Sequence, residues 1–269
     1  MFLDWRRCLP LLLAVPVLAH AQCSRSLNVP VAPVGLSVTT VGETVGGLYP
    51  ELLRGLGGKD GCTFEFSVVP RARQEAMFET GRADLLVPAT RTPRRDELGV
   101  FVPMVNSRPS LISLGAARPE VHSLAELLER RELRVAVVRG YDYGETYQSL
   151  LKELTRQGRL VHAVDPVSVA RMLNSGIADL TIMAPTILIG SLQGDVRVRF
   201  LLERMRYEPI TELPWGESGI YLSHKSLNEA DRNLLRELLE RSAKSGAIWR
   251  AFQRYYPVAN LGDSIRPRQ

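Results

Sequence analysis

Apolar residues follow two different spacings along the chain. Short apolar runs typical of buried strands fall at 27–32, 64–69, 84–88, 133–138, 160–164 and 218–222. Segments whose apolar residues recur at helical spacing lie between and after them, at 49–55, 72–80, 145–157, 226–242 and 246–256. Strand, helix and strand in this order predict βαβ units with right-handed crossovers, so we expect an α/β protein with largely parallel sheets flanked by helices.

The first 21 residues predict a secretory signal peptide. Arg6 and Arg7 precede an apolar run from Leu9 to Ala19, and Ala21 ends a small-x-small cleavage site. The run is shorter than the roughly 20 residues that a transmembrane helix needs. We therefore expect export to the periplasm as a soluble chain that starts at residue 22, with an uncleaved membrane anchor as the alternative.

Two cysteines remain after the signal segment, because Cys8 leaves with it. Cys23 and Cys62 each stand just ahead of a predicted strand, and parallel neighbouring strands would bring the two sulfurs within bridging range. Pairing is the default in an oxidising compartment, so the sequence predicts a Cys23–Cys62 disulfide. A lipid anchor at Cys23 is the weaker alternative, because Gln22 stands where a lipidation signal has a small residue.

An internal repeat predicts two similar lobes. GRADLLVPAT at 81–90 recurs as GIADLTIMAPT at 176–186, with Asp84 and Asp179 placed 95 positions apart. Gly81 and Gly176 stand where a helix would end in the left-handed conformation, and both aspartates are expected to cap the following turn. Ligands bind outside the carboxyl ends of strands in open α/β sheets. Two such lobes facing each other would enclose a ligand cleft and close on it by hinge motion.

Charge and composition exclude several other classes of function. The formal charge is +5, and it becomes +4 once the signal segment is removed. Acidic residues are mixed among the basic ones and no basic tract is interleaved with aromatics, so nucleic-acid binding has no support. The four histidines have no partners at a catalytic motif, and no metal-ligand spacing is present. We therefore predict no catalytic residues, no metal and no cofactor.

Several short motifs, in this order and spacing, resemble the solute-binding proteins of polar amino acid ABC transporters, solute-binding protein family 3. They are GLYPELL at 47–53, GRAD at 81–84, TPRR at 92–95, SLAEL at 123–127 and SGAIWRAFQRYY at 245–256. The resemblance implies the two-lobe type II periplasmic binding protein fold, in which the chain crosses between lobes twice. Lobe 1 would then comprise residues 22–114 and 215–269, and lobe 2 residues 115–214. It also implies a small-molecule ligand, an inner-membrane ABC permease as partner and a monomer.

The same resemblance implies which residues of lobe 1 hold the ligand. Arg95 matches the arginine whose paired donors fork onto the ligand's carboxylate, and Thr90 matches a position that donates to the same group. Ala184 stands where the family has the acid that meets an ammonium group. Arg71 and Arg73 stand where the family has an aromatic wall. If both face the cleft with Arg95, a dicarboxylate or other anion is favoured, although Arg73 could equally lie on the outer face of its helix.

In lobe 2, residues 139–144 form the turn between a strand and a helix, where free N–H groups could receive an anion. Tyr141 and Asp142 depart from the small hydroxyl residues of the family, and Asp142 could instead meet a positive part of the ligand. A rigid tyrosine turn packed on its own lobe remains an equal alternative. Trp215 is expected to pack at the hinge.

The sequence thus predicts a non-enzymatic periplasmic protein that captures a small polar, carboxylate-bearing solute for an ABC transporter. One alternative is a secreted lyase of the cyclohexadienyl dehydratase type, which resembles these binding proteins and acts on anionic dicarboxylates. A second alternative is a periplasmic sensory input module with the same ligand chemistry.

Overall fold

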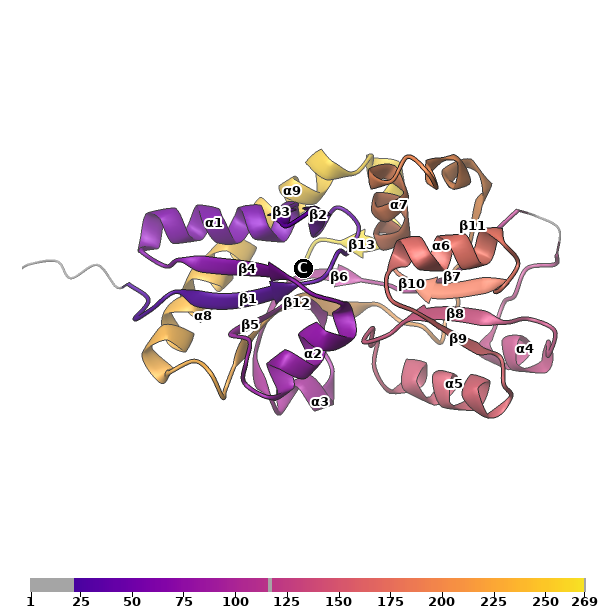
Figure 1. Cartoon of the computed structure of the whole chain (residues 1–269), viewed down its shortest axis with the longest axis horizontal. Helices are drawn as coiled ribbons and strands as arrows, with labels where there is room; N and C mark the ends of the chain where they lie inside the picture. Colours follow the sequence, from indigo (N-terminus) through magenta and orange to yellow (C-terminus); the bar gives the residue numbers. More distant parts are fainter. Residues whose placement is uncertain (1–21, 116–117, 269) are drawn as a thin grey trace, which may run out of the picture.

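The computed structural model describes residues 22–115 and 118–268, and the predicted signal peptide, residues 1–21, lies outside this range. The described chain forms two lobes that lie side by side along the long axis of the molecule (Figure 1). Lobe 1 contains the sheets built from the first and last thirds of the chain, and lobe 2 contains one five-stranded sheet from the middle.

Lobe 1 begins with two parallel strands, β1 (Leu27–Val31) and β4 (Phe64–Val68), joined through helix α1 (Leu48–Asp60). A short hairpin, β2 (Thr39–Val41) with β3 (Thr44–Gly46), precedes α1 and has no counterpart in the sequence prediction. The next unit is α2 (Arg71–Glu79) followed by β5 (Leu85–Thr90), which lies beside β1. Helices α8 (Glu229–Lys244) and α9 (Ala247–Tyr255) cover this lobe, and their apolar faces join its core.

The predicted disulfide is present between Cys23 and Cys62, whose Cα atoms are 4.9 Å apart. The parallel register, with Leu27 opposite Phe64, brings the segments ahead of the two strands together, as the sequence indicated. Because the Cys23 sulfur is part of this bond, it is not available for a lipid thioether. A disulfide fits a location outside the cytoplasm.

Lobe 2 has the strand order β11 (Met205–Glu208), β7 (Ser110–Leu114), β10 (Leu180–Met183), β8 (Val135–Val138) and β9 (Leu160–Ala163). The last three of these strands are parallel, as βαβ crossovers require, whereas β7 and β11 join antiparallel at one side. Apolar clusters on both faces of the sheet hold the helices to it. The helices of this lobe are α4 (Leu124–Glu129), α5 (Glu145–Arg156), α6 (Pro166–Asn174) and α7 (Pro185–Gly194), with the 3-10 turn η1 at Arg199–Arg204.

The chain passes from one lobe to the other after β6 (Gly99–Ser107) and returns at β12 (Gly216–Ser223). These two strands pair antiparallel with each other, and β12 also pairs antiparallel with β5, so lobe 1 is less uniformly parallel than the pattern predicted. Arg108 donates to the carbonyl oxygens of Ile210 and Leu213 and so ties the outgoing segment to the returning one. Since β7 belongs to the sheet of lobe 2, we propose that the first crossover lies near residue 108, one strand earlier than the expected boundary at 114.

The C-terminal segment adds a third strand to this connection. After the 3-10 turn η2 (Val258–Asn260), β13 (Ile265–Arg266) pairs antiparallel with Ser107 and Asn106 of β6. The Arg266 guanidinium lies 4.0 Å from the centroid of the Trp215 ring, so Trp215 packs at the connection between the lobes.

The internal repeat is the same structural unit in both lobes. Gly81 and Gly176 follow their helices with φ of 75° and 70°, values that disfavour any residue with a Cβ atom. Asp84 accepts a hydrogen bond from the Asn28 backbone at 2.7 Å, and Asp179 accepts one from the Arg134 backbone at 2.8 Å. Each aspartate therefore joins its strand to the neighbouring strand, which confirms a structural role for both.

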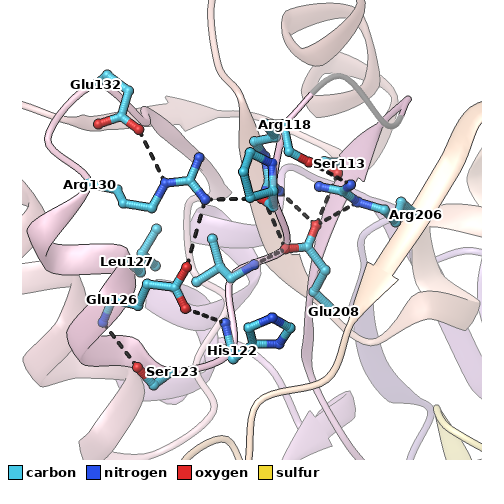
Figure 2. A network of polar contacts seen from close by, with 12 residues as sticks. Ser113, Arg118, His122, Ser123, Glu126, Leu127, Arg130, Glu132, Arg206 and Glu208 are labelled. Atoms are coloured by element: carbon cyan, nitrogen blue, oxygen red, sulfur yellow. Dashed lines mark hydrogen bonds and ion pairs between the residues drawn. The ribbon is translucent and has the colours of Figure 1, made fainter.

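Lobe 2 also contains a buried polar network around Glu208, at the end of β11 (Figure 2). Arg118 binds the Glu208 carboxylate with two donors, at 2.7 and 3.1 Å, and Arg206 adds a third at 3.0 Å. The Val121 backbone N–H donates at 2.7 Å. Burial raises the pKa of Glu208, but these donors and the two positive charges outweigh it, so the pKa lies below its ordinary value.

Among the described residues, no helix is long and apolar enough to cross a membrane.

Candidate functional site

A cavity of about 50 Å³ lies between the two lobes. It is far smaller than the roughly 300–1,000 Å³ of pockets that take drug-sized molecules, but it adjoins a second cavity of about 400 Å³. The ends of β5 and β6, the start of β12, the start of α2 and the turn before α5 surround it. The β5 and α5 sides are strand-to-helix turns, where a site is expected. Its lining comprises Val34, Arg71, Pro88, Ala89, Thr90, Arg95, Ser107 and Ser218 on one side and Tyr141, Asp142, Tyr143 and Ile187 on the other.

Arg95 reaches the cavity from a four-residue helix, α3 (Pro93–Asp96). The Thr92 hydroxyl accepts from the Arg95 backbone N–H at 3.4 Å, and Pro93 supplies the fixed φ that suits a first helical residue. This turn directs the Arg95 side chain inward, where the residue is only 3% exposed. Arg95 donates to the Thr90 carbonyl oxygen at 2.8 Å and to both carboxylate oxygens of Glu75, at 2.7 and 3.2 Å.

Arg71 is the first residue of α2 and is 5% exposed. One terminal nitrogen donates to the Gln74 side chain at 3.0 Å and to the Pro88 carbonyl oxygen at 2.9 Å. The other donates to Glu75 Oε1 at 2.6 Å. Gln74 is itself fixed by a bond of 3.0 Å to the Val87 carbonyl oxygen, so the Arg71 guanidinium is held in place on three sides.

Glu75 therefore bridges two buried guanidinium groups, and the three side chains carry a net charge of +1. Burial raises the pKa of Glu75, but the charges of Arg71 and Arg95 outweigh this effect, so its pKa is lowered overall. Burial lowers the pKa of Arg71, and Arg95 lowers it further while Glu75 acts in the opposite direction. A carboxylate between two guanidiniums is what allows both arginines to stay buried.

Two polar atoms at this cavity have no hydrogen-bond partner among the described residues: Arg71 Nε and the Tyr141 hydroxyl. They come from opposite lobes, and Tyr141 is 9% exposed. Burial is the largest cause that raises the pKa of Tyr141, so the phenol stays protonated and can donate. Buried polar groups are almost always paired in proteins, so two unpaired donors on residues that line one cavity are available to a polar solute.

The turn of lobe 2 is held by its own aromatic packing. The Tyr141 and Tyr143 rings meet edge to face at 6.3 Å, and Tyr143 and Tyr147 do so at 5.1 Å. Asp142 Oδ1 accepts from the Gly144 backbone N–H at 2.9 Å, and Asp142 also lines the cavity. The turn is thus rigid and also lines the cavity, so the two alternatives considered from the sequence are compatible.

The structure brings together five of the six residues predicted to bind ligand: Arg71, Thr90, Arg95, Tyr141 and Asp142. Arg73 does not line this cavity and is exposed, because two residues along a helix turn its side chain by about 200° from that of Arg71. The Thr90 carbonyl oxygen is occupied by Arg95. Ala184 is buried at the start of α7, where Ser264 of the C-terminal segment bonds the Thr186 backbone at 2.9 Å.

Glu75 and Gln74 were not found from the sequence. A usable signal was present, because Glu75 stands four residues after Arg71 on one helix face, the spacing of a helical ion pair. The contact of Glu75 with Arg95, 20 positions away, depends on how α2 and α3 pack.

A larger cavity of about 400 Å³ adjoins the first and shares Arg95, Tyr141 and Asp142 with it. Arg94, Arg139 and His162 also line it. The lobes touch here, because a Cβ atom built on Gly140 would lie 3.0 Å from the Ala72 backbone nitrogen. Among the residues with described positions, no group of three or more His, Cys, Asp or Glu side chains is arranged to hold a metal ion.

Solved structures with this arrangement were found at low sequence identity. A histidine kinase sensor domain with similarity to periplasmic binding proteins matches 90% of this chain and 98% of its own, with a TM-score of 0.69 and 18% identity. An amino acid ABC transporter substrate-binding protein from Streptococcus pneumoniae, bound to L-arginine, matches 86% and 95% with a TM-score of 0.66 and 17% identity. An ancestral amino acid-binding protein, a precursor of cyclohexadienyl dehydratase, matches 86% and 95% with a TM-score of 0.66 and 15% identity.

The chain has the type II periplasmic binding protein fold. The two lobes and the interlobe cavity are thus the features expected from the motifs at 47–53, 81–84 and 92–95. No protein-family model matches the sequence, and no curated protein matches it either.

Proposed function

We propose that this protein is a periplasmic solute-binding protein that closes its two lobes on a small, carboxylate-bearing solute and delivers it to an ABC-type permease. The observation that carries the proposal is the pair of orphan donors, Arg71 Nε and the Tyr141 hydroxyl, at one cavity between the lobes. Groups from both lobes at one cavity make ligand binding favour the closed state, which is the requirement for hinge closure.

The charges on the two walls support a carboxylate as the bound group. The Arg71, Glu75 and Arg95 side chains give the lobe 1 wall a net charge of +1, whereas Asp142 lines the lobe 2 wall. A solute with a carboxylate toward lobe 1 and a polar or positive group toward Asp142 would satisfy both walls. The amino acid and small carboxylate classes meet this requirement.

An enzymatic role is the second candidate, and one observation favours it. His162 and Asp142 line the same larger cavity, and burial together with the charge of Arg139 lowers the pKa of His162, which favours its neutral, basic form. A lyase of the cyclohexadienyl dehydratase type would bind a dicarboxylate here. A sensory input module, like the matched kinase sensor domain, would use the same solute but a different partner.

Calorimetry on residues 22–269 with amino acids, monocarboxylates, dicarboxylates and prephenate tests the proposal, with product analysis of every ligand that binds. A binding protein returns its ligand unchanged, and conversion of prephenate would establish the lyase instead. Absence of heat with all of these solutes would contradict the proposed ligand class.

The Tyr141→Phe substitution removes one orphan donor without changing the shape of the ring. We expect it to weaken binding by roughly tenfold, the effect of one hydrogen bond of about 1.4 kcal/mol. Tyr207→Phe is the matched control, because Tyr207 is exposed in lobe 2 and lines neither interlobe cavity described above. Equal affinities for the two variants would remove Tyr141 from the site.

A further inference from the structure

Glu75 occupies the position at which a bound carboxylate would meet Arg95. Its two oxygens lie 2.7 Å and 3.2 Å from Arg95 Nη2 and Nε, which is the paired arrangement that a guanidinium offers to a ligand carboxylate. The remaining terminal nitrogen of Arg95 bonds the Thr90 carbonyl oxygen. The protein thus supplies its own carboxylate to the arginine that the sequence identified as the ligand fork.

Arg71 differs from Arg95 because one of its three nitrogens has no hydrogen-bond partner among the described residues. Both of its terminal nitrogens are bonded, to Gln74, Pro88 and Glu75, while its Nε has no partner among the described residues. The Nε–H of Arg71 and the Tyr141 O–H are then the donors left for one carboxylate. A ligand carboxylate in this cavity would therefore meet Arg71 and not Arg95.

The charge balance adds a second restriction. With Glu75 in place, the side chains of Arg71, Glu75 and Arg95 sum to +1, which one carboxylate neutralises. The described residues that line the opposite wall are Tyr141, Asp142, Tyr143 and Ile187, and none of them is basic. Within this cavity a second carboxylate on the ligand would meet no basic side chain on the lobe 2 wall and would face Asp142 instead, because Arg139 lines only the adjoining larger cavity. Two like charges a few ångströms apart in a partly buried site repel strongly.

We propose that Glu75 is the specificity-determining residue of this site: as an internal counter-ion it moves the ligand carboxylate to Arg71 and excludes solutes with a second carboxylate. The inference rests on the proposed function, since it names the charge of the solute that the cavity takes. This inference replaces the expectation of a dicarboxylate ligand, which depended on three converging arginines. Arg73 is exposed, and Glu75 neutralises the charge of Arg95.

Matched ligand pairs that differ by one charge test the proposal: propionate against succinate, and L-glutamine against L-glutamate. For the native protein we expect the ligand with one carboxylate to bind at least about tenfold more tightly in each pair that binds, given the strength of a single charge contact at this depth. A native protein that binds succinate or L-glutamate equally or more tightly overturns the proposal without any variant.

Two variants then test whether the charge of Glu75 is the cause. Glu75→Gln raises the net charge of the three side chains to +2 and is expected to reduce that preference by about tenfold or reverse it. The double variant Glu75→Gln with Arg95→Gln restores +1 and leaves Arg71 in place, so the native preference should return. Glu237→Gln, an exposed change on α8, is the control for a lost negative charge elsewhere.

The outcomes separate the two proposals. Binding with a preference that Glu75→Gln leaves unchanged overturns the role of Glu75 and leaves the binding function intact. Loss of all carboxylate binding in the double variant would show that Arg95 is the ligand donor. That result would also overturn the proposed role of Glu75. If the native protein binds none of the four probes, the proposed ligand class fails, and the inference fails with it.

Discussion

Each lobe contains a buried glutamate that holds two arginines. Glu75 joins Arg71 and Arg95 beside the interlobe cavity, whereas Glu208 joins Arg118 and Arg206 away from it. Each group leaves one buried arginine donor unpaired among the described residues, but Arg71 lines the interlobe cavity, whereas Arg206 lines neither cavity described above. The second group fixes the segment that leads into α4 through the Val121 backbone. The same chemistry thus lines the proposed ligand site at one place and holds a loop of lobe 2 at the other.

The Glu208→Gln substitution should destabilise the protein by roughly 3 kcal/mol at pH 7, because it leaves two buried guanidiniums without their counter-charge. The folded pKa of Glu208 is below its unfolded value of about 4.3, so its contribution is complete above that pH and is lost as the pH falls through the folded pKa. Urea unfolding at several pH values measures this effect. The native protein should lose more stability on acidification than the variant does.

Glu203→Gln is the control for this substitution, because Glu203 is exposed and lies in η1, five residues before Glu208. Parallel pH profiles for the native protein and Glu208→Gln would show that the network contributes nothing through ionisation.

At the scale of elements, the disulfide holds the parallel strands β1 and β4 together, because both strands are short. Both strands have five residues, and the bond joins segments that are 39 positions apart in sequence. Phe64 and Phe66 of β4 are only partly buried, so packing alone holds the outer strand of the lobe weakly.

The double substitution Cys23→Ser with Cys62→Ser should cost about 3–4 kcal/mol of stability, from the loop of 39 residues that the bond closes. Thermal unfolding of the native protein with and without reductant, compared with the variant, measures it. The native protein under reducing conditions should match the variant, and the variant should not respond to reductant. A native melting temperature that is insensitive to complete reduction would contradict the prediction.

At the scale of the whole molecule, the lobes meet at Gly140. This residue has a φ of 86°, and an added Cβ atom would lie 3.0–3.1 Å from backbone atoms of Arg71 and Ala72 in the other lobe. Backbone atoms cannot move aside as a side chain can, so a larger residue would hold the lobes apart.

Gly140→Ala should therefore weaken ligand binding by at least about tenfold and shift the protein toward an open form with a larger radius of gyration in solution scattering. Gly144→Ala provides the control: its φ of 93° imposes the same backbone strain, but its added Cβ atom would meet no atom within 4 Å. Equal losses of affinity in the two variants would assign the effect to backbone strain and not to closure.

Much of the fold could be predicted from local patterns. The apolar runs at 27–32, 64–69 and 160–164 match strands β1, β4 and β9 to within a residue or two at each end, since burial of alternate or continuous apolar side chains is a local property. The helix expected at 226–242 begins later than its pattern suggested, because Asn228 accepts from the Asp231 backbone N–H and caps α8. The Ser226 hydroxyl instead donates to the Ala83 carbonyl oxygen, a partner far away in sequence.

The sequence by itself determined the duplicated βαβ plan and the disulfide pairing, because each follows from spacing along one chain, whereas the site residues came from the resemblance of short motifs. The tertiary structure decided which charges meet. Arg73 points outward while Glu75, on the same helix, turns in and meets Arg95 across a helix contact. A pattern assigns a residue to a face, but the charge of a buried site depends on side chains that approach from separate elements, and only packing brings them together.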